Sequence, residues 1–270
     1  MSTRRASLCQ LALLLACINT ILGIPFDLGR QTDVLLAQEQ LKELNDELDK
    51  SQLTEEIVLK FVNNNSNDTV VGINREIKLH CEAYGSPVPT IVWTKNGKII
   101  QGSFDLPLVE KLRNIGNRVV SFNTIASDLY IPCASKLDAG SYSCITYNGH
   151  LQKERSIEVT VEGEGDEFCE ETKLTVPRIT QFTDSRFENE NNAVQMNCRT
   201  NDKRAKVAWY NSNHELLNNQ ENFDVLSNGD LLIKKIDWEL MGEYICVVSN
   251  GFGQDSRVGF MYPLAAENPL

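Results

Sequence analysis

Two pairs of cysteines are the residues of this chain best placed to do chemistry, and the chemistry that they favour is disulfide formation. Each pair encloses a tryptophan and a tyrosine at matching positions. The tryptophan follows the first cysteine by 12 or 11 residues, and the tyrosine precedes the second cysteine by two. The two sets are Cys81, Trp93, Tyr142 and Cys144, and then Cys198, Trp209, Tyr244 and Cys246. Because all four positions recur together, chance pairing of cysteines does not account for the pattern.

This spacing is typical of the immunoglobulin sandwich, in which cysteines on strands B and F join two sheets. The strand C tryptophan packs on that disulfide, and the tyrosine hydroxyl ties the corner before strand F back to the backbone. We therefore expect an all-β fold of two tandem, I-set-like immunoglobulin sandwiches with the disulfides Cys81–Cys144 and Cys198–Cys246. Each bridge closes a loop of roughly 50 to 65 residues, which in the chain-entropy model stabilises the fold by about 4 kcal/mol.

Alternating apolar and polar residues place the strands that carry these positions. In strand B of the first sandwich Ile77 and Leu79 alternate inward with Cys81, and Asn96-Gly97 predicts a hairpin turn after strand C. Residues 101–124 predict an irregular connection before strand E. The expected organisation is a first domain over 69–162, an acidic linker over 163–173, a second domain over 174–264 and a tail over 265–270.

Residues 1–23 have the pattern of a secretory signal peptide. Arg4 and Arg5 precede an uncharged apolar run over 11–22, and Gly23 offers a small residue for cleavage. The run is short for a membrane span, which needs roughly 20 residues, although an uncleaved anchor is the alternative. The last residues of the sequence form no apolar tail of the kind that a membrane helix or lipid anchor uses. We therefore expect a secreted, soluble, extracellular protein.

The chain is acidic, with a formal net charge of −11. Removing the signal peptide takes away two arginines and no acids, which leaves 24 basic and 37 acidic residues and a net charge of −13. A chain of this sign repels nucleic acid and anionic lipid. The expected partners are therefore extracellular or cell-surface proteins, without nucleic acid and without insertion into a membrane.

Residues 24–68 form an arm and linker before the first domain. Leu41, Leu44 and Leu48 recur at helical spacing among acidic residues, which predicts an amphipathic helix from about Asp33 to Lys50. The apolar stripe is too short for a coiled coil. A partly helical, solvated arm is the preferred interpretation, and a helix that binds a partner or a second copy is the alternative.

Two sequons for N-linked glycosylation lie at the end of this arm. They start at Asn64 and Asn67, three positions apart in the sequence. In a secreted, exposed segment we expect at least one of the two asparagines to carry a glycan.

Six cysteines remain after the signal peptide is removed, an even number that indicates disulfides in a secreted chain. The two sandwich bridges leave Cys133 and Cys169. When the domains are aligned at an offset of 102 residues, Cys133 falls opposite Lys235 and faces solvent at the end of strand E. A Cys133–Cys169 bridge that staples the linker to the first domain is expected, and free thiols or an intermolecular bridge are the alternatives.

The second domain carries residues more specific than the fold. Residues 223–263, with Trp238 and Met241 before Gly242 and Tyr262-Pro263 near the end, resemble the nematode zwei-Ig family of secreted two-immunoglobulin-domain proteins. They are also similar to an insect relative, the secreted imaginal morphogenesis protein that binds insulin-like peptides. The resemblance implies a binding protein of cell adhesion and recognition that maintains the position of axons and neurons. The alternative that it implies is an extracellular protein that binds insulin-like peptides and antagonises insulin signalling.

No set of residues predicts catalysis. The three histidines lie far apart in sequence, and motifs of hydrolases, nucleotide-binding loops and zinc proteases are missing. The acidic linker could hold calcium weakly, but a solvated segment is the simpler interpretation, and Lys203, Arg204 and Lys206 form a small basic loop of the second domain. We therefore expect no enzyme, no cofactor and no metal site. An apolar patch on one sheet large enough for a hormone helix would favour the insulin alternative over adhesion.

Overall fold

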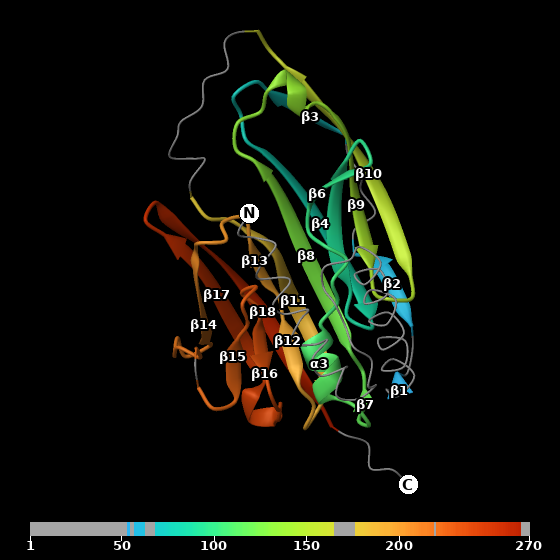
Figure 1. The fold of residues 1–270 in the computed structure, drawn as a ribbon, viewed down its shortest axis with the longest axis vertical. Coiled ribbons are helices and arrows are strands. Elements are labelled where there is room, and N and C mark those ends of the chain that lie inside the picture. Colours follow the sequence, from blue (N-terminus) through green and yellow to red (C-terminus); the bar gives the residue numbers. More distant parts are fainter. Residues whose placement is uncertain (1–52, 55–56, 63–67, 165–175, 219, 266–270) are drawn as a thin grey trace, which may run out of the picture. The chain divides into compact units, whose positions relative to one another are not determined.

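The computed structural model describes residues 53–54, 57–62, 68–164, 176–218 and 220–265, and within them the chain is all-β (Figure 1). All of these residues belong to one compact unit that begins at Gln52. The expected signal peptide and the expected helix of the arm lie outside the described residues. No helix in the described ranges has the length and hydropathy needed to cross a membrane.

The first sandwich stacks a five-stranded sheet on one half of a longer sheet. In spatial order the five strands are β3 (Thr69–Gly72), β10 (Gln152–Glu162), β9 (Gly140–Tyr147), β5 (Thr90–Lys95) and β6 (Lys98–Gln101). The strands that they cover are β2 (Val58–Phe61), β4 (Ile77–Ser86) and β8 (Phe122–Ile131). Strand β4 follows the expected alternation, because Ile77 and Leu79 are buried in the core while Lys78 and His80 are exposed.

Two segments of the first domain differ from the sequence expectation. Strand β2 pairs with β4, so the sheet takes up residues that were expected in the arm. The connection over 101–124 is more ordered than expected, because it holds the helix α3 (Leu108–Arg113) and the strand β7 (Arg118–Val119). The latter pairs with β1 (Leu53–Thr54). The hairpin between β5 and β6 turns at Asn96 and Gly97, whose φ angles of 50° and 78° suit a type I′ turn.

The second sandwich repeats the plan with shorter strands. Its larger sheet contains β14 (Lys206–Asn211), β17 (Gly242–Asn250), β18 (Gly253–Leu264) and β11 (Ile179–Asn189). Its smaller sheet contains β12 (Val194–Met196), β16 (Leu231–Ile233) and β15 (Phe223–Val225), and β13 (Cys198–Thr200) pairs with β11. The 3₁₀ turns η1 (Lys136–Asp138) and η3 (Trp238–Leu240) form the corners before the F strands of the two domains.

The two domains share a single sheet. Strand β11 pairs in parallel with β18 of its own domain and antiparallel with β8 of the first domain, from Gln181 opposite Ser127 to Phe187 opposite Phe122. The spatial order β14-β17-β18-β11-β8-β4-β2 therefore runs through both sandwiches without a break. In an isolated immunoglobulin domain the edge of strand E is taken by strand D. Here the first strand of the second domain takes that edge.

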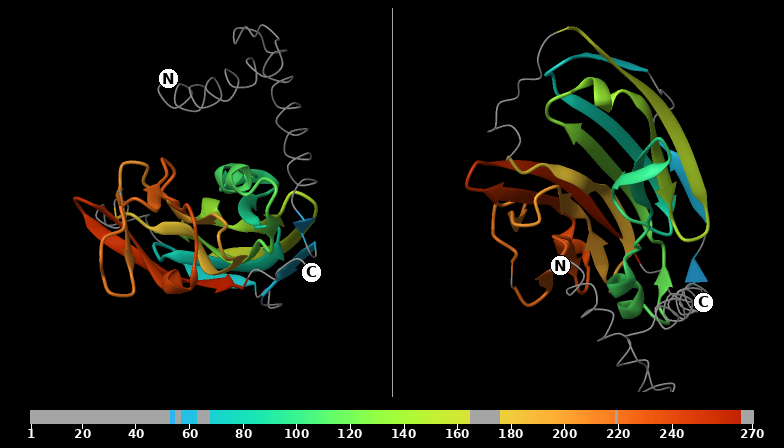
Figure 2. Two further views of the ribbon diagram at one scale, coloured as in Figure 1. Left: turned by 90° about the horizontal axis from the view of Figure 1, so that it is seen from below. Right: turned by 45° about the horizontal axis from the view of Figure 1, so that its top comes forward.

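Both hydrophobic cores lie on the same face of this long sheet. Arg186 on β11 stands between Asn123 on β8 and Met261 on β18. Met261 belongs to the second core, and Ile125, two residues from Asn123, belongs to the first. Opposed residues of neighbouring strands point to the same face, so these contacts place both cores on one face of the sheet. No strand of the described part covers the opposite face, which we call the open face. Figure 2 shows α3 on one side of the sheet.

A buried ionic cluster holds the join together on the core side. The Arg186 guanidinium is fully buried and contacts the Glu110 carboxylate of α3 at 2.5 Å and the Glu188 carboxylate at 3.1 Å. The second oxygen of Glu110 accepts the backbone N–H of Gln195 at 2.6 Å. Burial raises the pKa of the Glu110 carboxyl, against the opposing effect of the Arg186 charge. The cluster thereby ties α3 of the first domain to strands β11 and β12 of the second.

Side-chain amides take the place of missing strands at two sheet edges. Asn114, just after α3, donates to the carbonyl of Ala193 at 2.9 Å and accepts its N–H at 2.7 Å. Asn218 pairs in the same way with the edge of β14, donating to the carbonyl of Val207 at 3.0 Å and accepting the N–H of Trp209 at 2.9 Å. These edges therefore have their backbone groups satisfied without a further strand.

Replacing Arg186 tests the ionic cluster. We expect Arg186→Met to lower the free energy of unfolding by about 3–5 kcal/mol, because it leaves two buried carboxylates without their cation. Urea denaturation of the purified protein measures the change. The control is Arg178→Met, which removes an exposed interdomain ion pair with Glu76 at 3.7 Å and should cost at most about 1 kcal/mol. An equal, small effect of both substitutions would contradict this account of the join.

Candidate functional site

The residues of the cysteine–tryptophan–tyrosine pattern form the centres of the two sandwiches. The structure joins Cys81 to Cys144 and Cys198 to Cys246, with Cα–Cα distances of 6.4 and 6.5 Å. Trp93 and Trp209 are buried, and their indole N–H groups donate to Ser127 Oγ and to the carbonyl of Gly229. The hydroxyls of Tyr142 and Tyr244 donate to the carbonyls four residues earlier, at 2.7 and 2.9 Å. These residues are structural, and none of them forms a surface for a partner.

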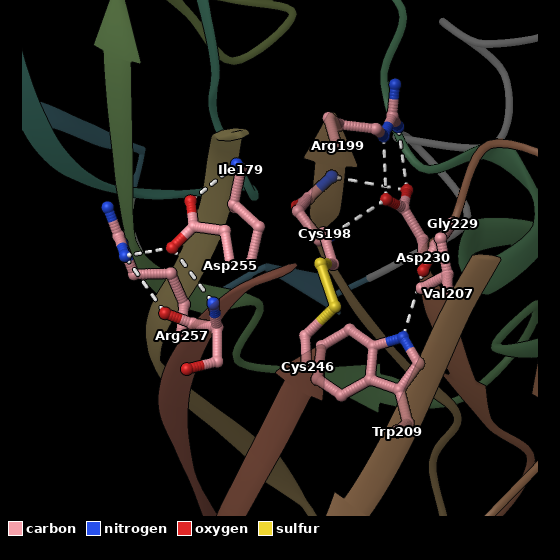
Figure 3. The surroundings of a disulfide bond; sticks show 12 residues. Ile179, Cys198, Arg199, Val207, Trp209, Gly229, Asp230, Cys246, Asp255 and Arg257 are labelled. Carbon is pink, nitrogen blue, oxygen red and sulfur yellow. Dashed lines mark hydrogen bonds and ion pairs between the residues drawn. A yellow bond between two sulfur atoms is a disulfide. The ribbon is translucent and has the colours of Figure 1, made fainter. Parts of the chain in front are cut away.

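Figure 3 shows the second disulfide with its polar neighbours. The buried Asp230 carboxylate accepts the backbone N–H of Cys198 at 3.1 Å and forms two hydrogen bonds with the Arg199 guanidinium, at 2.6 and 2.7 Å. The Asp230 carboxylate thus satisfies the backbone N–H of Cys198 beside the disulfide. It also neutralises the charge of Arg199.

The other expected site residues lie at or beyond the limits of the described chain. Cys133 is part of a disulfide, but its expected partner Cys169 lies outside the described residues, so the pairing stays a prediction. The sequon asparagines Asn64 and Asn67 also lie outside the described residues.

The open face of the long sheet carries a row of aromatic rings that crosses from one domain to the other. The row consists of Tyr84 on β4, Phe122 on β8, Phe187 on β11, Tyr262 on β18 and Trp238 in η3. Consecutive ring centroids are 5.5, 6.2, 5.7 and 5.6 Å apart, within the range of favourable aromatic pairs. We call this set the aromatic row and treat it as the candidate binding face.

The aromatic row is accessible, and apolar neighbours widen it at the second domain. Its four strand residues are half-buried, and Trp238 is 44% exposed. Phe260 and Val258 on β18 are 39% and 47% exposed. Exposed apolar surface that is contiguous marks interaction sites on soluble proteins. The face is also stiff, because it is built on paired strands rather than on loops.

A charged cluster in the first domain adjoins the join between the domains. Its centre is Asp128 on β8, which is 2% exposed. The carboxylate is contacted by His80 at 2.7 Å, Lys78 at 3.2 Å and, from the second domain, Arg257 at 3.0 Å. The Tyr130 hydroxyl donates to the same carboxylate at 3.0 Å. The cluster is thus a second polar link between the domains.

The contacts around Asp128 shift the pKa of this carboxyl and of the His80 imidazole. Burial alone would raise the pKa of Asp128, but the hydrogen bonds from His80, Arg257 and Lys78 hold it well below its ordinary value. The hydrogen bond to Asp128 raises the pKa of the His80 imidazole, against partial burial, and Glu82 at 3.9 Å adds to the effect. His80 therefore holds its proton to higher pH than a free imidazole does.

Sequence reasoning missed the aromatic row, and the signal for it was weak. Its members come from four strands and a corner that are far apart in the chain, and they meet only because β11 pairs with β8. The sequence of β11 is compatible with a strand, but the register shift between Thr183 and Ser185 interrupts the alternation of its faces. The sequence does not indicate which strand pairs with β11. Within the described ranges no group of three or more His, Cys, Asp or Glu residues is arranged to hold a metal ion.

Comparison with known proteins places the chain among proteins with two immunoglobulin domains. The immunoglobulin domain family model matches residues 60–148 and 176–250. The chain is 40% identical over 226 residues to the Zwei Ig domain protein zig-4 of Caenorhabditis elegans, covering 83% of this chain and 87% of that protein. It is 34% identical over 254 residues to zig-3 of the same organism, covering 93% and 98%.

An insect protein is similar in sequence and in fold. The neural/ectodermal development factor IMP-L2 of Drosophila melanogaster is 27% identical over 268 residues, covering 96% of each chain. A crystal structure of IMP-L2 matches with a TM-score of 0.60 and 24% identity, over 78% of this chain and 97% of that chain. This structural likeness extends over both domains and concerns the fold.

The titration of His80 predicts a pH-dependent contribution to stability. Because the folded pKa of His80 is raised, its contribution is complete below the unfolded pKa near 6.5 and is lost as the pH rises through the folded value. Asp128 stays ionised throughout this range. We expect the stability difference between the wild type and His80→Gln to be larger at pH 5.5 than at pH 8.5. Urea denaturation at the two pH values measures it.

The control for this prediction is His214→Gln, because His214 lies in an exposed turn of the second domain. The pH dependence of the His80→Gln difference is measured relative to this variant. A His80→Gln difference that is constant with pH, or larger at pH 8.5, would show that the His80–Asp128 contact does not titrate as described.

Proposed function

Because the chain belongs to the zwei-Ig family of two-immunoglobulin-domain proteins, we propose that it is a secreted, non-enzymatic protein that binds another extracellular protein. The pattern of a signal peptide over residues 1–23 and the even number of cysteines that remain after it support secretion. Immunoglobulin sandwiches bind through sheet faces and end loops, and such binding needs no cofactor and no reacting side chain.

One observation carries the proposal, namely the aromatic row on the open face of the long sheet. Aromatic anchors account for a large share of binding energy at protein interfaces, where a few residues each contribute about 2 kcal/mol or more. Here five rings are held in a fixed line by backbone pairing across four strands. A partner that docks on the row loses little entropy in ordering the surface that it meets.

The first candidate partner is a cell-surface adhesion protein. The resemblance to the zwei-Ig family implies a role in keeping axons and neurons in position, and a stiff surface made by two domains suits the capture of another folded domain. In this function the protein acts as an extracellular ligand of a receptor. The net charge of −13 that remains without residues 1–23 favours a partner with a basic surface.

The second candidate is an insulin-like peptide, and the apolar character of the row favours it specifically. A helix of a small hormone presents an apolar face of a few turns, at 5.4 Å per turn. The four spacings between the five rings, of 5.5 to 6.2 Å, together match about four such turns. In this function the protein sequesters the hormone and antagonises its signalling.

One experiment separates the two candidates. The tagged, full-length protein is expressed in the animal or in cultured cells and purified from extracellular fluid, and the proteins that accompany it are identified by mass spectrometry. Recovery of insulin-like peptides without any surface protein would exclude adhesion, and recovery of a surface receptor without such peptides would exclude hormone capture. Each candidate is then tested with the purified partner by calorimetry.

The aromatic row predicts which substitutions weaken binding. We expect the double variant Trp238→Ala and Phe260→Ala to raise the Kd for the recovered partner at least tenfold, because two exposed anchors are lost. The matched control is Phe252→Ala in the turn between β17 and β18, which removes an aromatic ring that is 64% exposed and is not part of the row. If the control variant loses as much affinity as the double variant, the open face is not the binding surface.

A further inference from the structure

A cleft between the two domains lies apart from the aromatic row and is not used by the function proposed above. Its volume is about 660 Å³, within the range of ligand sites, which occur preferentially at domain interfaces. The first domain contributes the end of β6 and the residues after it, from Ile100 to Ser103. The second domain contributes β13 with its following loop, from Arg199 to Lys203, and the turn Ser227–Gly229.

Among the described strands none pairs with the edge of β6 beside this cleft. Strand β6 is the last strand of the five-stranded sheet. Ile100 lies at a register irregularity of its pairing with β5, between Gln101 opposite Trp93 and Ile99 opposite Thr94. Ile99 and Ile100 are 51% and 44% exposed. An edge strand with exposed apolar side chains is a template for pairing with another chain.

The contrast with the edge of β14 shows that the β6 edge is unguarded. At β14 the amide of Asn218 occupies the backbone groups of Val207 and Trp209. Among the described residues no side chain bonds in this way to the backbone of 98–100. Within the described residues, a side chain therefore satisfies the backbone at the edge of β14, whereas the edge of β6 beside the cleft stays unpaired.

The charges and polar groups of the cleft indicate what would fill it. Arg199 is neutralised by Asp230, and Asp202 accepts from Asn250 and lies 3.7 Å from Arg204. Lys203 has no ion-pair partner in the part of the chain that the structure describes. Gln181, which also lines the cleft, is 6% exposed, and its side-chain amide nitrogen donates to the Thr90 hydroxyl at 3.5 Å.

We propose that the cleft between β6 and the loop after β13 binds an extended peptide segment of a partner protein, which adds a strand to the free edge of β6. Main-chain hydrogen bonds to an edge strand supply affinity in this mode, and alternate side chains supply specificity. The four residues of β6, at 3.2–3.4 Å each, span about 13 Å, so the paired segment is about four residues long. It carries apolar side chains against Ile99 and Ile100 and an acidic residue opposite Lys203.

The test uses the full-length secreted protein and a random twelve-residue peptide library displayed on phage. Peptides enriched on the wild type are synthesised, and their Kd values are measured against three variants. Ile100→Pro removes a backbone donor at the edge, where proline is tolerated at a register irregularity. Lys203→Glu reverses the charge of the cleft. Lys206→Glu is the matched control, because it reverses an exposed lysine close by in sequence that does not line the cleft.

We expect the enriched peptides to contain an acidic residue. Their Kd should rise at least tenfold with Ile100→Pro and about three- to tenfold with Lys203→Glu, and stay within twofold with Lys206→Glu. Hydrogen exchange should show that the bound peptide protects the amides of residues 98–102. If Ile100→Pro does not fold, Lys203→Glu and the exchange measurement decide the outcome.

Three results would overturn the proposal. The first is enrichment of no peptide above an unrelated immunoglobulin domain. The second is a set of peptides that bind Lys203→Glu as tightly as the wild type. The third is protection on the open face of the long sheet in place of β6. Because the aromatic row lies on that open face, loss of partner binding in the Trp238 and Phe260 variant leaves this test unaffected.

Discussion

The backbone pairing of β8 with β11 is the interaction on which the rest of the structure depends. Two sandwiches joined only by a linker are ordinarily free to turn about each other. Here antiparallel pairing fixes the orientation of the two domains. It extends from Gln181 opposite Ser127 to Phe187 opposite Phe122. It places both cores on one face of one sheet. It also places the aromatic rings of both domains in one line, so the candidate binding face exists only because of this pairing.

Two clusters of charged side chains connect the domains next to the paired strands β8 and β11. The buried Arg186, Glu110 and Glu188 cluster brings α3 against the second domain, and the Asp128 cluster adds Arg257 from β18. Burying charges costs free energy unless the geometry satisfies them. Such contacts therefore contribute specificity of arrangement more than net stability. The open aromatic face needs that specificity, since its rings belong to different domains.

The sequence predicted each sandwich well because the information is local to each domain. A cysteine, a tryptophan and a tyrosine at set spacings indicate strands B, C and F, and alternation along β4 indicates which side is buried. The join was not predictable in this way. Strand β8 ends as an ordinary strand E would, and nothing in its residues indicates that β11 takes the edge of strand D. Glu110 lies in a connection that lacks a periodic pattern, so its contact with Arg186 carries no signal in the sequence.

The shared sheet also has a consequence for biosynthesis. While the chain is being made, the first domain is complete up to residue 162 before β11 emerges, and until then the edge of β8 stands bare. Exposed strand edges are where nascent proteins aggregate. The first domain is therefore prone to aggregation during synthesis until β11 of the second domain pairs with β8. A stop codon between residues 163 and 178 would therefore release a complete first domain whose β8 edge is exposed, and this fragment would be prone to aggregation as well as inactive.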